Sequence, residues 1–88
     1  MRIKENYVLR QVADTWVVLP VGDAVADFNG MISLNESGSL LWKKLEEGSD
    51  LNGLASALTE EYDVTEKMAL KDAETFVCKL RNSQMLVD

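Results

Sequence analysis

The chain has 88 residues, and its 15 acidic residues outnumber its nine basic ones to give a formal charge of −6. The length predicts a single domain. An apolar fraction of 47% with 27% charged residues is typical of a globular protein rather than a disordered one. The acidic balance argues against binding to nucleic acid or to an anionic membrane, because both need clustered lysine and arginine.

The residue types that are missing restrict the chemistry. The sequence has no histidine and only one cysteine, Cys78. An intrachain disulfide and histidine-assisted nucleophilic catalysis are therefore excluded, and no EF-hand spacing of carboxylates is present. Residues 1–11 lack the apolar run of a signal peptide, and no stretch is long enough to span a bilayer. We expect a cytoplasmic protein without a metal or cofactor.

The first third of the chain has strand character. Two runs of β-branched and aromatic residues, 7–13 and 15–20, flank Asp14 and predict a hairpin. The second run is apolar on both faces, which indicates a strand that is covered on more than one side. Regular pairing should stop near Pro20, because proline has no N–H to donate.

A second hairpin is predicted at Asn29-Gly30, because this pair suits a turn with two positive φ angles. It would join strands over residues 24–28 and 31–34. The second of these strands carries no charge and no proline, and it runs directly into a helix. Such a strand often lies at a sheet edge, where unpaired N–H and C=O groups accept an added peptide strand. An ordinary interior strand is the alternative at this point.

Three helices are predicted in the remainder. Asn35 would cap the first and Gly48 would end it, Asp50 would cap the second, and Thr65 would open the third, over about residues 66–82. The inward positions are Gly38, Leu41, Trp42 and Leu45, then Leu51, Leu54, Ala55, Leu58 and Tyr62, then Ala69, Ala73, Phe76, Val77 and Leu80.

The order of these elements predicts an α+β fold resembling a winged helix. Three helices would pack on one side of a small antiparallel sheet of three to four strands, followed by a short apolar tail at residues 85–87. Within it, Trp42 and Phe76 are expected in the core rather than as ligand platforms. Cys78 is expected to be partly buried beside Val77. No serine or acidic pair has the partner that catalysis needs.

Three segments of the chain together resemble the PqqD-like family, the RiPP recognition elements that bind ribosomally synthesised precursor peptides. The segments are 18–48, 54–64 and 72–86, and the resemblance extends over roughly residues 7–87. Its most specific part is "LNESGSLLW", residues 34–42. The family's last helix usually ends at a glycine, whereas "RNSQ" fills that place here, so Asn82 or Ser83 would have to form the cap.

The resemblance implies a non-catalytic binding module over residues 1–88. It would capture the leader of a precursor peptide by strand addition and present it to a modifying enzyme, commonly a radical S-adenosylmethionine enzyme, or a peptidase or cyclase. The leader would lie in a groove between the edge strand and the third helix. The implied peptide-binding residues are Met31, Ile32, Ser33 and Leu34 on the strand and, by helical spacing, Asp72, Phe76 and Lys79 on the helix.

Two other functions stay open at this point. A winged-helix DNA-binding or regulatory domain would need a basic recognition helix. The third helix has a charge of only +1, from Lys67, Lys71, Lys79 and Arg81 against Glu66, Asp72 and Glu74 (4 − 3). The other alternative is a scaffold subunit that docks onto an enzyme and never holds the peptide.

Overall fold

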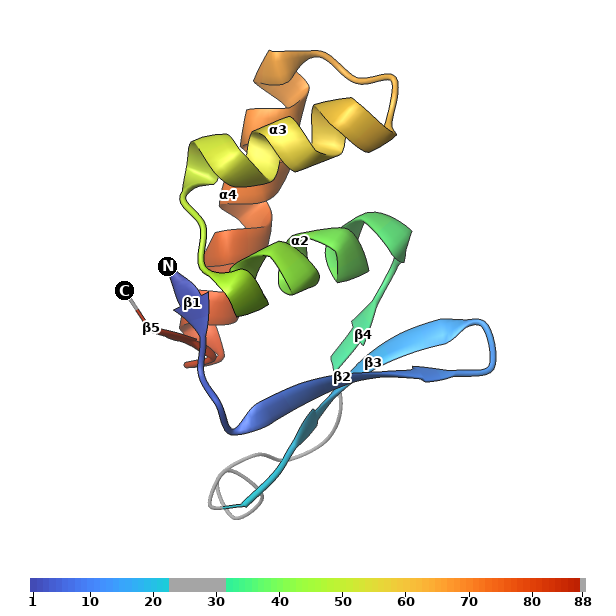
Figure 1. The fold of residues 1–88 in the computed structure, drawn as a ribbon, viewed down its shortest axis with the longest axis vertical. Coiled ribbons are helices and arrows are strands. Elements are labelled where there is room, and N and C mark those ends of the chain that lie inside the picture. The colour runs from blue at the N-terminus through green and yellow to red at the C-terminus, as the bar shows by residue number, and fades with distance from the viewer. Residues whose placement is uncertain (23–31, 88) are drawn as a thin grey trace.

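A computed structural model describes residues 1–22 and 32–87 of the chain (Figure 1). The elements in these residues are β1 (Arg2–Ile3), β2 (Tyr7–Val12), β3 (Thr15–Pro20), β4 (Ile32–Leu34), α2 (Glu36–Glu47), α3 (Leu51–Glu61), α4 (Glu66–Asn82) and β5 (Leu86–Val87). Strands β2, β3 and β4 form an antiparallel sheet in that order, and β1 pairs with β5. The predicted α+β architecture is confirmed. The β1–β5 pairing, which joins the two ends of the chain, was not predicted.

The first predicted hairpin is formed by β2 and β3. Its turn has two residues, and Ala13 in that turn adopts a φ of 55°, as the turns that suit such hairpins require. The register runs from Val12 opposite Thr15 to Tyr7 opposite Pro20, where β3 ends as predicted. Proline lies at a position of the ladder that donates no bond to β2, so its missing N–H costs the hairpin nothing.

Strand β3 is covered on both faces, as the sequence predicts. Val17 and Val18 point to opposite faces and are 5% and 0% exposed. Helix α2 lies over the sheet (Figure 1), and Lys43 of α2 places its ammonium 4.2 Å from the centroid of the Trp16 ring on β3. This cation–π contact adds to the packing that holds α2 against the sheet.

The three helices begin where the sequence predicts. Side-chain oxygens of Asn35, Asp50 and Thr65 accept hydrogen bonds from the backbone N–H three residues further on, at 2.8, 2.8 and 3.2 Å. Each bond satisfies one of the N–H groups that a helix leaves free at its start. Helix α2 ends at Gly48, whose φ of 94° is a conformation that glycine adopts at little cost. Within the described residues, no helix is long and apolar enough to cross a membrane.

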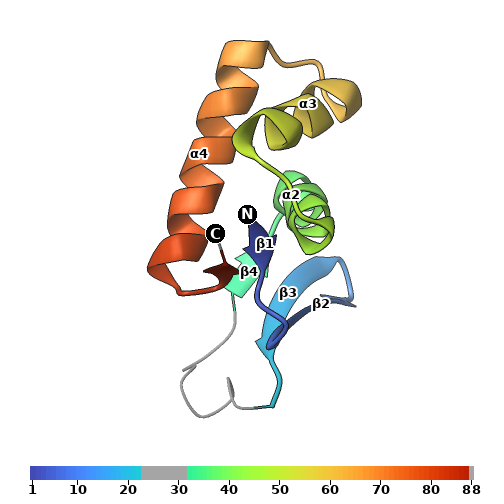
Figure 2. The same cartoon turned by 60° about the vertical axis from the view of Figure 1, so that its left-hand side comes forward.

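The core lies where the helices meet one another and the sheet (Figure 2). Its largest fully buried side chains are Trp42, Leu45, Leu54, Leu80, Met85 and Val18. Four predictions about burial need correction. Leu51 is only half-buried and packs against the core from the start of α3. Tyr62 is 38% exposed because it follows the end of α3 in an extended conformation, Phe76 is only half-buried, and Cys78 is exposed because it lies one position around α4 from buried Val77.

The C-cap of α4 is Ser83, one of the two residues expected there, but its φ is −90°. The left-handed residue is the next one, Gln84, with a φ of 58°. The Met85 N–H donates to the Leu80 carbonyl at 3.0 Å, and the Gln84 N–H donates to a carbonyl three residues earlier at 3.0 Å. These are the two bonds of a Schellman motif. The motif turns the chain so that Met85 is fully buried and β5 reaches β1.

Replacing Gln84 by glycine is expected to stabilise the fold by about 0.5–1 kcal/mol. A residue with a β-carbon pays about 1–2 kcal/mol for the left-handed conformation, and the greater backbone freedom of unfolded glycine offsets part of that relief. Urea denaturation would measure the difference. Gln84→Ala retains the β-carbon and should show no gain; a glycine variant less stable than the parent would contradict the assigned strain.

Candidate functional site

The hydrogen bonding of β3 follows from its hairpin with β2. In an antiparallel pair, positions that exchange two backbone bonds alternate with positions that exchange none. Val12 and Thr15 flank the two-residue turn and form a bonded pair. Because the positions alternate from this pair onward, Val17 directs its backbone groups toward β2. Trp16 and Val18 direct theirs toward β4.

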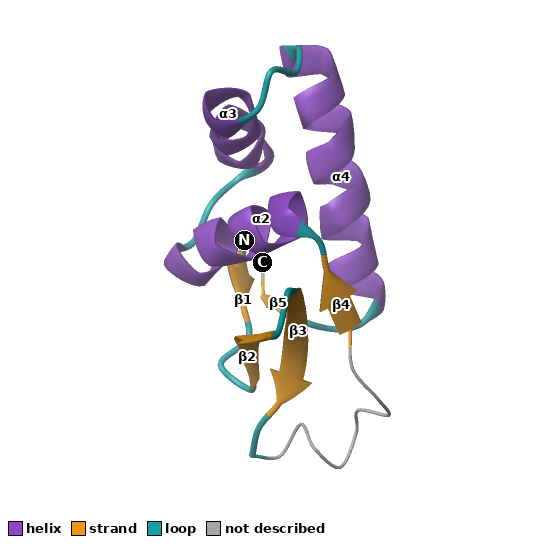
Figure 3. Ribbon diagram, turned by 90° about the vertical axis from the view of Figure 1, so that its right-hand side faces the viewer, coloured by secondary structure: helices purple, strands orange, loops and turns teal. Residues whose placement is uncertain are grey.

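Strand β4 has one flank paired and one flank open within the described residues. Leu34 lies opposite Trp16 and Ile32 lies opposite Val18, so these two residues of β4 direct their backbone groups toward β3. Ser33 lies between them and directs its N–H and C=O to the other side. No described strand pairs with β4 on that side (Figure 3). The expected sheet edge is therefore present in this part of the chain, and Ser33 is the residue that offers backbone bonds there.

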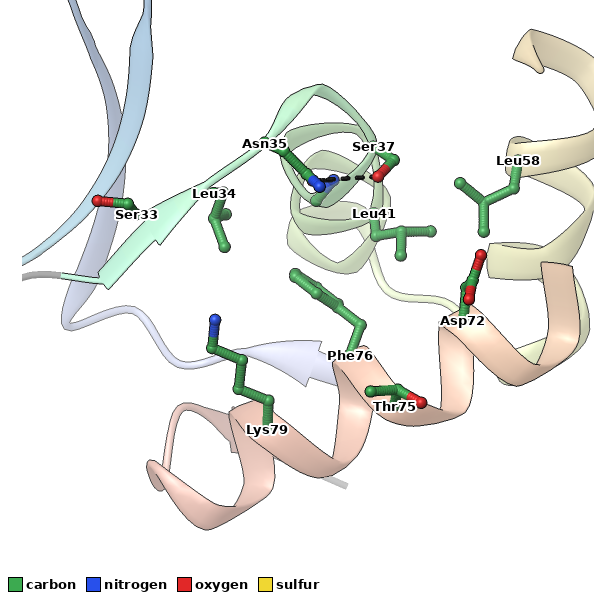
Figure 4. Close-up of a pocket in the computed structure, with 11 residues that line it drawn as sticks. Ser33, Leu34, Asn35, Ser37, Leu41, Leu58, Asp72, Thr75, Phe76 and Lys79 are labelled. Atoms are coloured by element: carbon green, nitrogen blue, oxygen red, sulfur yellow. Dashed lines mark hydrogen bonds between the residues drawn. The ribbon is translucent and has the colours of Figure 1, made fainter. Parts of the chain in front are cut away.

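A groove of about 540 Å³ runs along this open edge, between β4, the start of α2 and helix α4 (Figure 4). Its apolar surface comes from buried Leu34, Leu41 and Leu58 and from half-buried Phe76. Figure 4 shows Phe76 reaching up from α4 toward Leu34 and Leu41. The groove is thus an apolar channel beside the N–H and C=O of Ser33, which pair with no described strand.

Five of the seven predicted peptide-binding residues line this groove: Ser33, Leu34, Asp72, Phe76 and Lys79. Ile32 does not line it, because its half-buried side chain packs against the core. Met31 lies outside the described residues, as do the Asn29-Gly30 turn and the strand expected over residues 24–28. Leu41 and Leu58 were predicted as core residues and are also part of the groove, which their apolar spacing alone did not reveal.

A second cavity, of about 430 Å³, continues the groove past the start of α2. It shares Asn35, Ser37, Leu58 and Asp72 with the first cavity and adds Glu36, Tyr62 and Val64. The exposed ring of Tyr62, which the sequence assigned to the core, therefore borders this cavity. Together the two cavities form one surface, which we call the α4 groove; it extends from Lys79 at one end to Tyr62 at the other.

The junction between β4 and α2 is tight, and Gly38 makes it so. A β-carbon at this position would lie 3.1 Å from Oδ1 of Asn35 and 3.3 Å from Cβ of Leu34. Glycine here lets the helix start directly against the end of the edge strand. Asn35 Oδ1 also accepts the Ser37 hydroxyl at 3.0 Å, in addition to the capping bond from Gly38. These bonds hold the wall of the groove where strand passes into helix.

The described residues contain no group of three histidine, cysteine, aspartate or glutamate side chains that could hold a metal ion. The groove itself contributes one exposed cation, Lys79, and the carboxylates of Asp72 and Glu36. The groove is thus an apolar trough beside a strand edge that no described strand pairs with. It has a cation toward one end and carboxylates toward the other.

A family model described as coenzyme PQQ synthesis protein D (PqqD) matches residues 15–86. The chain belongs to the PqqD family. The match includes β3, β4 and all three described helices, so the open strand and the α4 groove both lie inside the PqqD-matching region. The family expected from the sequence is therefore confirmed.

Two solved structures share this PqqD-family fold over all or nearly all of their length. One is TbiB1 in complex with the TbiA(beta) leader peptide, with a TM-score of 0.79 and 25% identity over 100% of both chains. The other is a lasso peptide synthetase B1 complexed with the leader peptide, with a TM-score of 0.77 and 24% identity over 99% of this chain and 96% of that one. A search of the curated proteins found no match. Nothing in these comparisons favours the DNA-binding alternative.

Proposed function

We propose that this chain is a RiPP recognition element that binds the leader of a precursor peptide by adding it as a strand to β4. The observation that carries the proposal is the backbone of Ser33, whose N–H and C=O point into the open flank of β4, beside the α4 groove. A leader strand would exchange two hydrogen bonds with Ser33 and continue the antiparallel order of the sheet. Two proteins of similar fold hold leader peptides, which supports this choice of ligand.

The groove suits the side chains of such a strand. The leader residue opposite Ser33 would point away from the helices, as Ser33 itself does, and its two neighbours would point into the groove. There they meet the apolar surface of Leu34 and Phe76 (Figure 4). Backbone bonds would supply sequence-independent affinity, and the groove would select side chains at alternate positions.

The module would carry no catalytic activity of its own. We propose that it works in the cytoplasm and presents the bound leader to a separate modifying enzyme, either a radical S-adenosylmethionine enzyme or a peptidase or cyclase. Ordering a flexible leader costs about 2–5 kcal/mol of the gross interaction. The dissociation constant is therefore expected on the order of micromolar, which corresponds to about −8 kcal/mol.

A titration followed by NMR tests the proposal. Adding the leader of the precursor peptide to the ¹⁵N-labelled chain should shift the backbone amides of residues 32–35 and 72–79. The modified core segment of the same precursor is the control and should leave these amides unshifted. Unchanged spectra at a saturating, millimolar leader concentration would overturn leader binding.

A further inference from the structure

The α4 groove carries charges of opposite sign at its two ends. Asp72, Phe76 and Lys79 lie on one face of α4 at spacings of four and three residues. In Figure 4, Lys79 lies below Ser33 and Leu34, Phe76 lies in the middle, and Asp72 lies near Leu58. With a rise of 1.5 Å per residue, the backbone positions of Asp72 and Lys79 are about 10 Å apart.

Both charges are available to a ligand. The side chains of Asp72 and Lys79 are exposed, and neither forms an ion pair with another described residue. Lys79 is the only cation among the described residues that line either cavity of the groove. Glu36 adds a second carboxylate near Asp72, in the cavity that continues the groove. The groove is therefore polarised, with a cation at the Lys79 end and carboxylates at the α2 end.

Every second side chain of an added strand would face the charged and apolar side chains of the groove. Inward-facing side chains of an extended strand recur at about 6.7 Å, close to the 5.4 Å of one helical turn. Three successive inward side chains of a peptide bound along β4 would therefore lie beside Lys79, Phe76 and Asp72 in turn. A peptide that places an anionic side chain beside Lys79 and a cationic one beside Asp72 is attracted at both ends of the groove. A peptide with these two charges exchanged places like charges beside one another, which disfavours its binding.

We infer that the α4 groove selects peptides in which a cationic, an apolar and an anionic side chain follow one another at every second residue. This inference rests on the proposed strand addition. Antiparallel addition continues the sheet and pairs slightly more strongly than parallel addition. Because β4 runs from the Lys79 end toward Asp72, an antiparallel guest has its Lys or Arg on the N-terminal side, near Asp72 and Glu36. Its Asp or Glu lies four residues later, near Lys79.

A peptide-display library tests this preference and does not require the natural leader. Random twelve-residue peptides on phage would be selected on the full chain and on three variants. The parent should enrich an acidic residue two positions after an apolar one, and Lys79→Glu should enrich Lys or Arg at that position instead. Asp72→Lys should weaken or invert the preference for a cation two positions before the apolar residue.

Lys71→Glu is the matched control. Lys71 is exposed on the same helix and lines neither cavity of the groove, so its replacement changes the net charge equally. Its selected peptides should match those of the parent. For one selected peptide, replacing its acidic residue by lysine should weaken binding to the parent at least tenfold, and Lys79→Glu should recover most of that loss.

The outcomes separate this inference from the function on which it rests. If no peptide is enriched on any protein, strand addition itself fails and the charge preference fails with it. If peptides are enriched and compete with the leader, but Lys79→Glu and Lys71→Glu select the same patterns as the parent, the charge inference is overturned and leader binding stands. Enrichment of the reverse order, with the acidic residue first, also overturns it.

Discussion

Replacing Ser33 by proline is expected to weaken leader binding by roughly 10- to 100-fold. Proline removes the outward N–H of β4 and leaves the matching carbonyl of the bound peptide without a donor, which costs about 1–3 kcal/mol. The fold should survive, because Ser33 lies opposite Val17 at a position that exchanges no ladder bonds. Proline is tolerated at such edge positions. Fluorescence anisotropy of a labelled leader would measure the change in affinity.

Ser33→Ala is the matched control for this experiment. It removes the hydroxyl but retains the N–H, so its affinity should stay within about threefold of the parent, a change of at most about 0.7 kcal/mol. A folded Ser33→Pro variant that binds the leader as tightly as the parent would mean that the leader does not add to β4.

Methylation of single leader amides tests the same register from the ligand side, and it does not depend on the stability of a variant. An N-methyl group removes one donor of the peptide. Only the leader residue opposite Ser33, and those two positions away from it, direct their N–H toward β4. Loss of binding is therefore expected at the leader amide opposite Ser33 and not at the two amides next to it. Equal losses at consecutive amides would contradict strand addition.

The helices could be predicted from the sequence because their signals are local. Each helix is indicated by a capping side chain and by apolar residues at a 3.6-residue spacing. Both signals lie within one short segment of the chain. The predicted third helix, 66–82, therefore coincides with α4. The end of that helix was less predictable, because Gln84 adopts a left-handed conformation that residues with a β-carbon rarely take.

The pairing of strands was harder to predict, because it depends on residues far apart in the chain. Local turn signals indicated the β2–β3 hairpin correctly, but nothing local indicates that β4 pairs with β3 or β1 with β5. The same limit applies to the groove. Apolar spacing identifies Leu41 and Leu58 as inward residues, but whether such a residue fills the core or borders a gap depends on how two helices and a strand meet. The strand residues came from the family resemblance, and the positions on α4 from helical spacing.

Helix α2 connects the core to the groove. Leu41 lines the groove, while Trp42, the next residue, is 0% exposed at the centre of the core. The start of the same helix, fixed by the Asn35 cap, forms the junction with β4. The position of the groove wall therefore depends on how firmly Trp42 anchors α2 among the other elements of the core.

Replacing Trp42 by alanine is expected to reduce the free energy of unfolding by about 3–5 kcal/mol, because it leaves a large cavity in the core. A domain of this size has a total of only about 5–15 kcal/mol. The variant should thus be largely unfolded at a modest urea concentration, and leader binding should weaken with the loss of folded protein. Urea denaturation followed by far-UV circular dichroism would measure the loss.

Trp42→Phe should cost much less, within about 1.5 kcal/mol, because it keeps an aromatic ring in the core. The indole Nε1 of Trp42 is buried and has no hydrogen-bond partner among the described residues. Removing this N–H therefore removes a desolvated donor instead of a bond, which offsets part of the cost of the smaller ring. A phenylalanine variant as unstable as the alanine variant would contradict this explanation, because the indole N–H would then have to contribute a bond of its own to the folded state.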